Sequence, residues 1–347
     1  MELPKYSGTI HPEEWLKQIQ TYCYLKDIED EQKILKICKL MINSTISISN
    51  EINSFNELTK ALKSHTSFNI FKDSCKRKLQ IMKYIPEQEE NYTATFLANF
   101  CTLCNNAEIN NPEEIKSLLF NTYSSNEFFK DEMIRRMDII NSKGQPLDYI
   151  NEIVKLFNDV VFDEFNTIKY GSLIALKHVT TGRYLSSCNI DYKTGSHRKV
   201  IFAGEKYCNP HALWFLTKFS SSPLKKSYQQ NMVLYNDKFY LNHKETDKTF
   251  SLSFIYKSPT TGHSEAFCDN KIYSKSEWQF ISLNSNNTLY VKSKDIVNLR
   301  EQAYNDKYLY LRSHDFTFTI DDEKFQEVIG HSDRIGANDE WFIELIE

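Results

Sequence analysis

Three tryptophan segments recur in the C-terminal half, and they constrain the fold more than any other feature of the sequence. WFL at Trp214 is followed by WQF at Trp278 and WFI at Trp341, spaced 64 and then 63 residues apart. Recurrence at a fixed period indicates that one supersecondary unit is used several times. We therefore expect this half of the chain to consist of three copies of one unit.

Short runs typical of β-strands surround these tryptophans. The runs are LIALKHV, RYLSS, KVIFAG, LWFLTKF, MVLYN, KFYLN, FSLSFIY, EWQFISL, LYVKS, KYLYLRS, FTFTI, QEVIGH and EWFIELI. About a dozen strands fit three four-stranded units, and threefold packing closes a barrel and hides the sheet edges. We predict an all-β β-trefoil over residues 166–347, with the polar segment 220–231 as an exposed connection between the first two units.

The first half has helical periodicity from His11 to about Phe165 and is expected to form about eight short helices. The helix-start signals are Pro12 in a first turn, the S-x-x-E box of Ser54 and Glu57, Asn111 before Pro112, and Ser125 as a cap. A division near Pro86 separates two lobes. The predicted fold class is multidomain α plus β, with an all-α two-lobed helical domain at 1–165 (lobes about 1–86 and 87–165) followed by the β-trefoil.

Charge and segment composition exclude several classes of protein. A net charge of −4 lacks the Lys/Arg excess that a phosphate-binding surface requires, so we expect no nucleic-acid partner. The N-terminus MELPKYSGTIHPEEW has no apolar signal region, and no later run is long and uncharged enough to span a membrane. We expect a cytoplasmic protein whose eight cysteines are reduced thiols.

Two motifs allow a functional and a structural interpretation. The CxxC of Cys101 and Cys104 could bind zinc or form a redox dithiol, but it lies among apolar residues of a helical stretch, which favours packed free thiols. The basic cluster at 72–78 could contact RNA or an acidic membrane, but its apolar neighbours favour a solvated helix side. Phosphate loops and nucleophile–base motifs are absent from the sequence, so we expect neither an enzyme nor a cofactor.

The histidines and tryptophans of the predicted trefoil have similar alternatives. His178, His314 and His331 could be catalytic or metal-binding, and hydrogen-bonded structural roles are favoured. The three recurring tryptophans could stack on a sugar ring, but their regular spacing indicates a shared core layer.

The C-terminal half resembles the MIR domain, a β-trefoil module of protein O-mannosyltransferases, inositol-trisphosphate receptors and ryanodine receptors. The resemblance covers about residues 170–347 and rests on LKHVTTGRYLSS, YKTGS at 192–196, YLRSH, and FQEVIGHSDRIGANDEWFIELI. The middle unit is expected to lack the histidine after the leucine strand and the T-G-x-Y-L turn. The resemblance implies a binding module without chemistry of its own, which engages glycans or glycopeptides or serves as a packing platform. The expected ligand-binding residues lie in the third unit and are Arg312, His314, Gln326, His331 and Asn338.

The helical half is similar to the capsid region of Ty3-type retrotransposon Gag proteins. YSG at 6–8, PEEW at 12–15, FNELTKALKSHTSF at 55–68 and KRKLQIMKYIPEQEENYTATF at 76–96 carry this similarity, and no zinc knuckle follows them. The similarity implies self-association through two helical lobes. The combined prediction is a non-enzymatic binding and assembly protein, with a helical domain for self-association or partner docking and a trefoil that recognises a ligand or protein. The alternative is a lectin-like glycan-binding protein whose helical domain is a spacer or docking surface.

Overall fold

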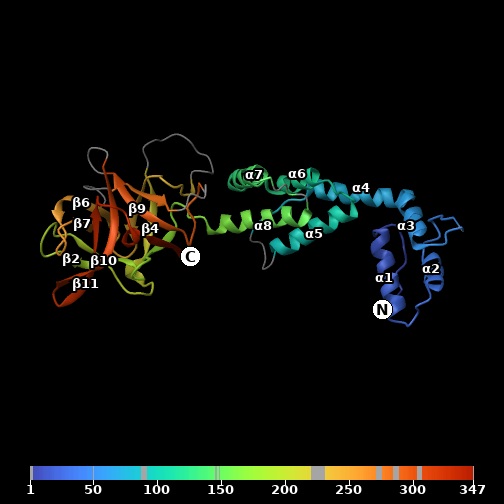
Figure 1. The fold of residues 1–347 in the computed structure, drawn as a ribbon, viewed down its shortest axis with the longest axis horizontal. Coiled ribbons are helices and arrows are strands. Elements are labelled where there is room, and N and C mark those ends of the chain that lie inside the picture. Colours follow the sequence, from blue (N-terminus) through green and yellow to red (C-terminus); the bar gives the residue numbers. More distant parts are fainter. Residues whose placement is uncertain are drawn as a thin grey trace. The chain divides into compact units, whose positions relative to one another are not determined.

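The computed structural model describes residues 3–49, 51–86, 92–144, 147, 149–219, 231–270, 276–283, 289–302 and 307–346. The chain divides into two compact units, Met1–Val161 and Phe162–Glu347. The first is built from helices and the second from antiparallel strands (Figure 1), which confirms the predicted fold class. The expected lobe boundary near Pro86 and the expected connection at 220–231 adjoin residues 87–91 and 220–230, which lie outside the described residues.

Eight α-helices occur in the described part of the chain. They are α1 (Pro12–Tyr24), α2 (Glu31–Leu40), α3 (Phe55–Ser64), α4 (Thr66–Ile81), α5 (Tyr92–Asn106), α6 (Pro112–Tyr123), α7 (Glu127–Ser142) and α8 (Ile150–Asn166). Around Trp15, the first three helices bury an apolar core, and the indole Nε1 donates to the carbonyl of Pro4 at 2.9 Å. Tyr84 follows α4, and its ring contacts those of Phe96 in α5 and Phe157 in α8 at centroid distances of 5.1 and 5.3 Å.

Side-chain caps fix where several of these helices begin. Asn111 Oδ1 accepts a hydrogen bond from the backbone N–H of Glu113 at 2.9 Å, and Ser54 Oγ accepts one from Glu57 at 3.2 Å, as the sequence predicts. The prediction that Ser125 caps α7 is wrong. Asn126 is the cap, because its extended backbone lets Oδ1 accept from the N–H of Phe129 at 2.9 Å.

The second unit contains twelve strands in its described residues. They are β1 (Leu173–His178), β2 (Leu185–Asp191), β3 (Lys199–Ala203), β4 (Trp214–Lys218), β5 (Phe239–His243), β6 (Thr249–Lys257), β7 (Ser264–Asp269), β8 (Trp278–Ser282), β9 (Ile296–Gln302), β10 (Tyr308–Ile320), β11 (Glu323–His331) and β12 (Trp341–Ile346).

Six of these strands form a closed antiparallel barrel. The pairings run β1–β4, β4–β5, β5–β8, β8–β9, β9–β12 and back from β12 to β1. The other six strands form three hairpins, β2–β3, β6–β7 and β10–β11, and their second strands pair with one another as β3–β7, β7–β11 and β11–β3. A six-stranded barrel with a triangle of three hairpins is a β-trefoil.

The recurring tryptophans occupy equivalent places in this trefoil. Each is the first residue of the fourth strand of its unit and is fully buried in the barrel core. The indole N–H groups of Trp214, Trp278 and Trp341 donate to the carbonyls of Leu185, Phe250 and Leu311 at 2.8, 3.1 and 3.2 Å. The structure thus places these residues in a shared core layer and not on a sugar-binding face.

A ring of three backbone hydrogen bonds joins the lead-in segments of the three units. The N–H of Ile168 donates to Val291, that of Val291 to Val233, and that of Val233 to Ile168, each at 2.9 Å. Two of these segments, MVLYN and LYVKS, are predicted from sequence as strands. That prediction is wrong, because they make only isolated bridges, including Leu234 with Tyr290.

Two real strands, β7 and β9, escape the sequence prediction. Both carry polar residues at buried positions, which obscures the alternation expected of a half-buried strand. Glu265 in β7 and Asn298 in β9 are 0% and 2% exposed, respectively. Asn298 donates from Nδ2 to the carbonyl of Asp339 at 2.8 Å, so the burial of its amide is compensated by a hydrogen bond.

Candidate ligand pocket

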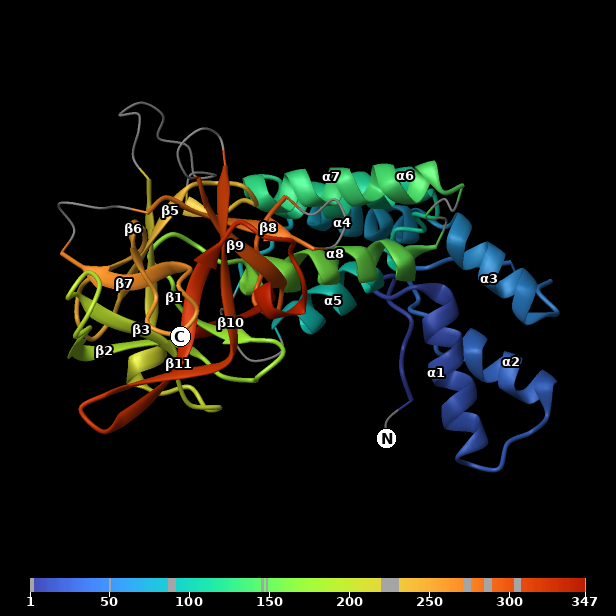
Figure 2. The ribbon, with the colours of Figure 1, turned by 60° about the vertical axis from the view of Figure 1, so that its left-hand side comes forward.

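A cavity of about 570 Å³ lies on the seam between the first and third units of the trefoil. Its lining residues come from the residues just before β2, from β2, β3 and the segment after β3 on one side, and from the β10–β11 hairpin on the other. They are Arg183, Cys188, Ile190, Phe202, Ala203, Gly204, Glu205, His211, Thr317, Glu323, Lys324, Phe325 and Gln326. We call this cavity the seam pocket. The β10–β11 hairpin, drawn in red, extends beside β2 in both ribbon views (Figures 1 and 2).

Strand pairing brings the two sides of the seam pocket together. Gln326 of β11 is directly opposite Ala203 of β3, although the two are far apart in sequence. Gly204 follows at the end of β3, where a Cβ atom would lie 2.5 Å from Ser186 Oγ, so this wall requires glycine. The site therefore exists only when the third unit closes against the first.

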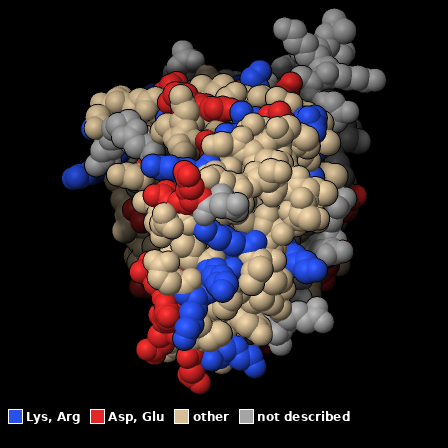
Figure 3. Space-filling view, turned by 90° about the vertical axis from the view of Figure 1, so that its right-hand side faces the viewer, with Lys and Arg blue, Asp and Glu red and all other residues tan. Residues whose placement is uncertain are grey.

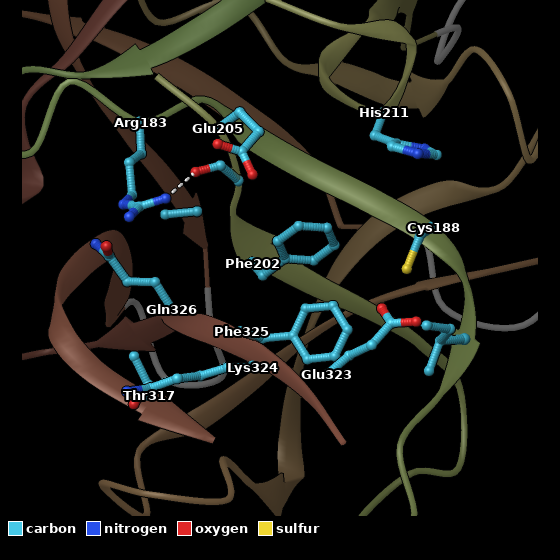
Figure 4. A pocket seen from close by; sticks show the side chains of 13 residues that line it. Arg183, Cys188, Phe202, Glu205, His211, Thr317, Glu323, Lys324, Phe325 and Gln326 are labelled. Carbon is cyan, nitrogen blue, oxygen red and sulfur yellow. Dashed lines mark hydrogen bonds between the residues drawn. The ribbon is translucent and has the colours of Figure 1, made fainter. Parts of the chain in front are cut away.

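Two phenylalanines form an apolar wall of the seam pocket. The rings of Phe202 and Phe325 pack edge to face with centroids 4.8 Å apart, and both side chains appear in Figure 4. Cys188 and Ile190 of β2 extend this side. Burial raises the pKa of the Cys188 thiol, with a further contribution from the charge of Glu323, so the sulfur is protonated at neutral pH.

Two hydrogen-bonded side chains face each other on the polar side of the pocket. Arg183 donates from one terminal guanidinium nitrogen to the carbonyl of Gly204 at 2.7 Å, the bond dashed in Figure 4. Gln326 donates from Nε2 to Ser313 Oγ at 3.0 Å. These bonds orient both groups and leave further donors on Arg183 and an acceptor on Gln326 for a ligand.

Three charged side chains, Glu205, Glu323 and Lys324, complete the lining. Within the described residues none of the three forms an ion pair. His211 differs, because its Nδ1 lies 2.5 Å from Glu245 Oε2. The seam pocket therefore combines a fixed apolar wall with polar groups that are not consumed by the fold, which is the pattern of small-ligand sites.

Of the residues that the sequence nominates for binding, Gln326 alone lines the seam pocket. Arg312 and His331 converge instead on Asp339, which is fully buried. Arg312 donates to both Asp339 oxygens at 2.7 and 3.0 Å, and His331 Nε2 donates to Oδ1 at 2.8 Å. Although burial raises the pKa of Asp339, the bonds from His331 and Arg312 outweigh it and lower the pKa to about 2. Asn338 precedes this carboxylate, and its carbonyl accepts from His178 Nε2 at 2.9 Å.

The remaining nominated residue, His314, lies against another buried carboxylate. Its Nε2 is 3.3 Å from Glu327 Oε2. Glu327 also accepts hydrogen bonds from the backbone of Thr260 and the hydroxyl of Thr261, both at 2.8 Å. Burial raises the pKa of Glu327, but the adjacent His314 ring and the bonds from the two threonines outweigh it and lower the pKa to about 2. This contact ties the β6–β7 turn to β11.

The middle unit keeps the histidine that the sequence comparison expects it to lack. His243 packs on Trp214 at 4.8 Å, as His178 packs on Trp341 at 5.0 Å. His243 Nε2 donates to the carbonyl of His211 at 2.9 Å. Burial lowers the pKa of His243 and that of His178. The expectation is therefore wrong, and these histidines have structural partners.

The other sequence motifs give no reaction centre in the described part of the chain. Cys104 is buried and Cys101 half-buried in α5, and no group of metal-binding side chains occurs among the described residues. In the basic cluster, Lys72 pairs with Glu108 at 2.9 Å. One face of the molecule shows lysines and arginines interspersed with acidic and uncharged residues (Figure 3). Of the helices described, none combines the length and apolar character needed to cross a bilayer.

Comparison with family models and with curated sequences yields no match. Solved structures do match. An SDF2-like protein from Arabidopsis thaliana is similar at 24% identity and a TM-score of 0.44, over 51% of this chain and 94% of that one. The Saccharomyces cerevisiae protein O-mannosyltransferase Pmt1–Pmt2 complex is similar at 17% identity and a TM-score of 0.41, over 80% of this chain and 43% of that one. A ricin B-like lectin from Macrolepiota procera, in complex with lactose, is similar at 9% identity and a TM-score of 0.32, over 52% of this chain and 99% of that one. At these values the likenesses carry no argument about function, and the β-trefoil assignment rests on the strand pairings.

Proposed function

We propose that the protein is a non-enzymatic recognition protein whose trefoil binds a ligand or partner protein in the seam pocket. The observation that carries this proposal is the pocket lining. Arg183, Lys324 and Glu323 offer charged groups to a ligand beside the packed pair Phe202 and Phe325. Glu323 and Lys324 are exposed and form no ion pair among the described residues, so their charges remain available to a ligand.

The chemistry of the lining favours binding over catalysis. Cys188 is a protonated thiol, because burial raises its pKa, and a thiol is a weak nucleophile. His211 is engaged by Glu245 at 2.5 Å. Among the described lining residues, no nucleophile and base lie within hydrogen-bonding distance of each other. The resemblance to the MIR domain agrees with a binding role.

A lectin-like activity is the second candidate. Glu205 and Glu323 supply carboxylates on opposite parts of the lining, and carboxylates accept hydrogen bonds from sugar hydroxyls. In this version the trefoil binds a glycan, and the helical domain is a spacer or docking surface.

For the helical domain we propose self-association or partner docking. Its resemblance to Gag capsid regions motivates this role, and large apolar side chains are exposed on it, including Ile70 at 61% and Ile81 at 76%. Joining several trefoils would make weak contacts multivalent and raise the avidity about a hundredfold or more. Light scattering at micromolar concentration tests this role, and a monomer at every concentration would contradict it.

We also propose a cytoplasmic location. All eight cysteines are free in the structure, and Cys23, Cys38 and Cys268 are buried without a disulfide. Reduced thiols are typical of that compartment. Fractionation of cells that produce the tagged protein tests the location.

The recognition function is tested by probing the whole protein with a glycan array and a peptide array in parallel. Phe202→Ala removes half of the apolar wall, and we expect it to abolish the signal of any ligand that the parent protein captures. Ile255→Ala is the matched control, because Ile255 is an apolar residue of the same domain that is 81% exposed and lies outside the seam pocket. No signal on either array, or equal signals from parent and Phe202→Ala, would contradict the proposed function.

A further inference from the structure

The arrangement around Arg183 determines what kind of ligand group fits the seam pocket. A guanidinium carries five N–H donors, and in the described chain one of them is bonded, to the carbonyl of Gly204 at 2.7 Å. That bond fixes the plane of the group, and its free edge faces Gln326 across the pocket (Figure 4). A planar guanidinium with an open edge binds a carboxylate through two parallel hydrogen bonds.

The charges of the lining limit the ligand further. Arg183 and Lys324 are balanced by Glu205 and Glu323. A dianionic phosphate would meet two carboxylates and gain little from such a site. A ligand that carries one carboxylate together with a cationic group matches both signs.

The apolar wall of Phe202 and Phe325 also limits the kind of ligand that fits the seam pocket. Phe325 is 5% exposed, stacks on Phe318 at 5.6 Å and packs edge to face with Phe202 at 4.8 Å, so the pair Phe202 and Phe325 presents a corner and not a flat platform. A sugar ring stacks on an open aromatic face, whereas an aliphatic or aromatic side chain fits the corner between two inclined rings. Gln326, held by Ser313, keeps an amide oxygen that can accept a peptide N–H.

We propose that the seam pocket binds a polypeptide segment with three features: a carboxylate on Arg183, an apolar side chain against Phe202 and Phe325, and a basic side chain near Glu323. This inference rests on the proposed recognition function and names its ligand class. The cavity of about 570 Å³ has the size of sites that enclose a few side chains.

The test uses the whole protein and an array of capped hexapeptides. The peptides contain one Asp or Glu, one Phe or Leu, and one Lys in every order among Gly and Ser. The best binders are resynthesised with a fluorophore, and their dissociation constants are measured by fluorescence polarisation. We expect replacement of the peptide Asp or Glu by Asn or Gln to weaken binding about tenfold, as loss of a charge-assisted bidentate pair does.

Variants of the protein distinguish bidentate hydrogen bonding by the Arg183 guanidinium from a general effect of positive charge. Arg183→Gln is expected to weaken binding about tenfold, and Arg183→Lys nearly as much, because lysine keeps the charge and loses the planar donor pair. Lys257→Gln, which removes an exposed charge outside the seam pocket, is expected to leave affinity within about twofold. Glu323→Gln is a second pocket variant, at an exposed position, and is expected to weaken binding of the Lys-containing peptides, so it tests the proposal even if Arg183→Gln fails to fold.

Three results would overturn the inference. One is peptide binding that is indifferent to both Arg183→Gln and Glu323→Gln. Another is equal binding of the Asp and Asn peptides. The third is capture of glycans but not peptides by a site that Phe202→Ala destroys, which would leave the recognition function standing. Silence on both arrays would remove the recognition function together with this inference.

Discussion

Glu301 lies directly opposite Trp278 across the β8–β9 pair, at the place where the other two units set a histidine against a tryptophan. Its side chain is 6% exposed, and Oε2 is buried without a hydrogen-bond partner among the described residues. Burial, with a smaller effect from Glu277, raises the pKa of Glu301 to about 7. The three units therefore have equivalent strand pairings, but the third unit places a carboxylate where the other two place a histidine.

Glu301→Gln is expected to change how stability depends on pH. The folded protein binds this proton more tightly than the unfolded chain, whose pKa is the ordinary 4.5. The free energy of unfolding should therefore fall by about 3 kcal/mol as the pH rises from about 4.5 to above 7. Glu301→Gln removes that fall, so the variant should exceed the parent above pH 7. Urea unfolding followed by tryptophan fluorescence at pH 5 to 8 measures this.

Glu277→Gln is the control for that experiment, because Glu277 is a neighbouring carboxylate that pairs with Lys238 at 2.7 Å. It should keep most of the parental pH dependence, because burial is the main cause of the raised pKa of Glu301 and the charge of Glu277 adds the smaller part. An identical fall in stability for the parent and Glu301→Gln would show that Glu301 does not carry the effect.

Asp339→Asn is expected to destabilise the trefoil by about 3 kcal/mol, because Arg312 and His331 lose the carboxylate on which they converge. The folded pKa of about 2 lies below the ordinary 3.8, so the parent gains about 2 kcal/mol above pH 4 and loses it as the pH falls toward 2. Acid titration of stability should show this loss in the parent and not in Asp339→Asn. Asp333→Asn, at a carboxylate that is 61% exposed, should behave like the parent.

Gly195→Ala and Gly262→Ala form a matched pair in two equivalent hairpin turns. Their φ angles are +72° and +70°, so both substitutions carry the same left-handed backbone strain of about 1 kcal/mol. A Cβ at Gly195 would also collide with the carboxylate of Glu265, whereas nothing lies within 4 Å at Gly262. Chemical denaturation should therefore show a clearly larger loss for Gly195→Ala. Equal losses would mean that the Glu265 carboxylate moves aside freely.

Glu108→Gln tests the ion-pair cluster of the helical unit. Glu108 contacts Lys63 at 2.7 Å and Lys72 at 2.9 Å, and these lysines hold its pKa at about 2 despite partial burial. The carboxylate is 28% exposed, so solvent screening limits the expected loss to about 1 kcal/mol. Thermal unfolding followed by helical circular dichroism measures it. Glu113 has a carboxylate that is 80% exposed, so Glu113→Gln should lower stability by less than Glu108→Gln does. A larger loss of stability for Glu113→Gln would contradict this expectation.

The sequence predicts the architecture because the features that determine it are local or periodic. The tryptophan recurrence indicates three units, and caps such as Asn111 mark helix starts. β9 is missed because polar residues such as Asn298 are buried in it with partners supplied by distant backbone. Periodicity cannot reveal such compensation.

Of the residues that line the seam pocket, the sequence predicts only Gln326. The others are missed because their role depends on contacts between distant parts of the chain. Arg183 lies in the run RYLSS and carries no sign there that its guanidinium faces a residue more than a hundred positions away. Arg312 and His331 are polar residues near turns, as binding residues often are, yet they support Asp339. Which polar groups remain available to a ligand depends on the pairing of β3 with β11, and no local signal encodes that pairing.

The ring of backbone hydrogen bonds among Ile168, Val233 and Val291 has a consequence for the order of events during synthesis. The ring needs all three units, and β1 completes its pairing only with β12, the last strand. The helical unit can fold as soon as it leaves the ribosome, since its contacts are mostly between neighbouring helices. The barrel must wait for its final strand, with the edges of β1 and β9 exposed in the meantime. Slow translation or an early stop within the third unit would therefore release a chain prone to pair with other chains through those edges.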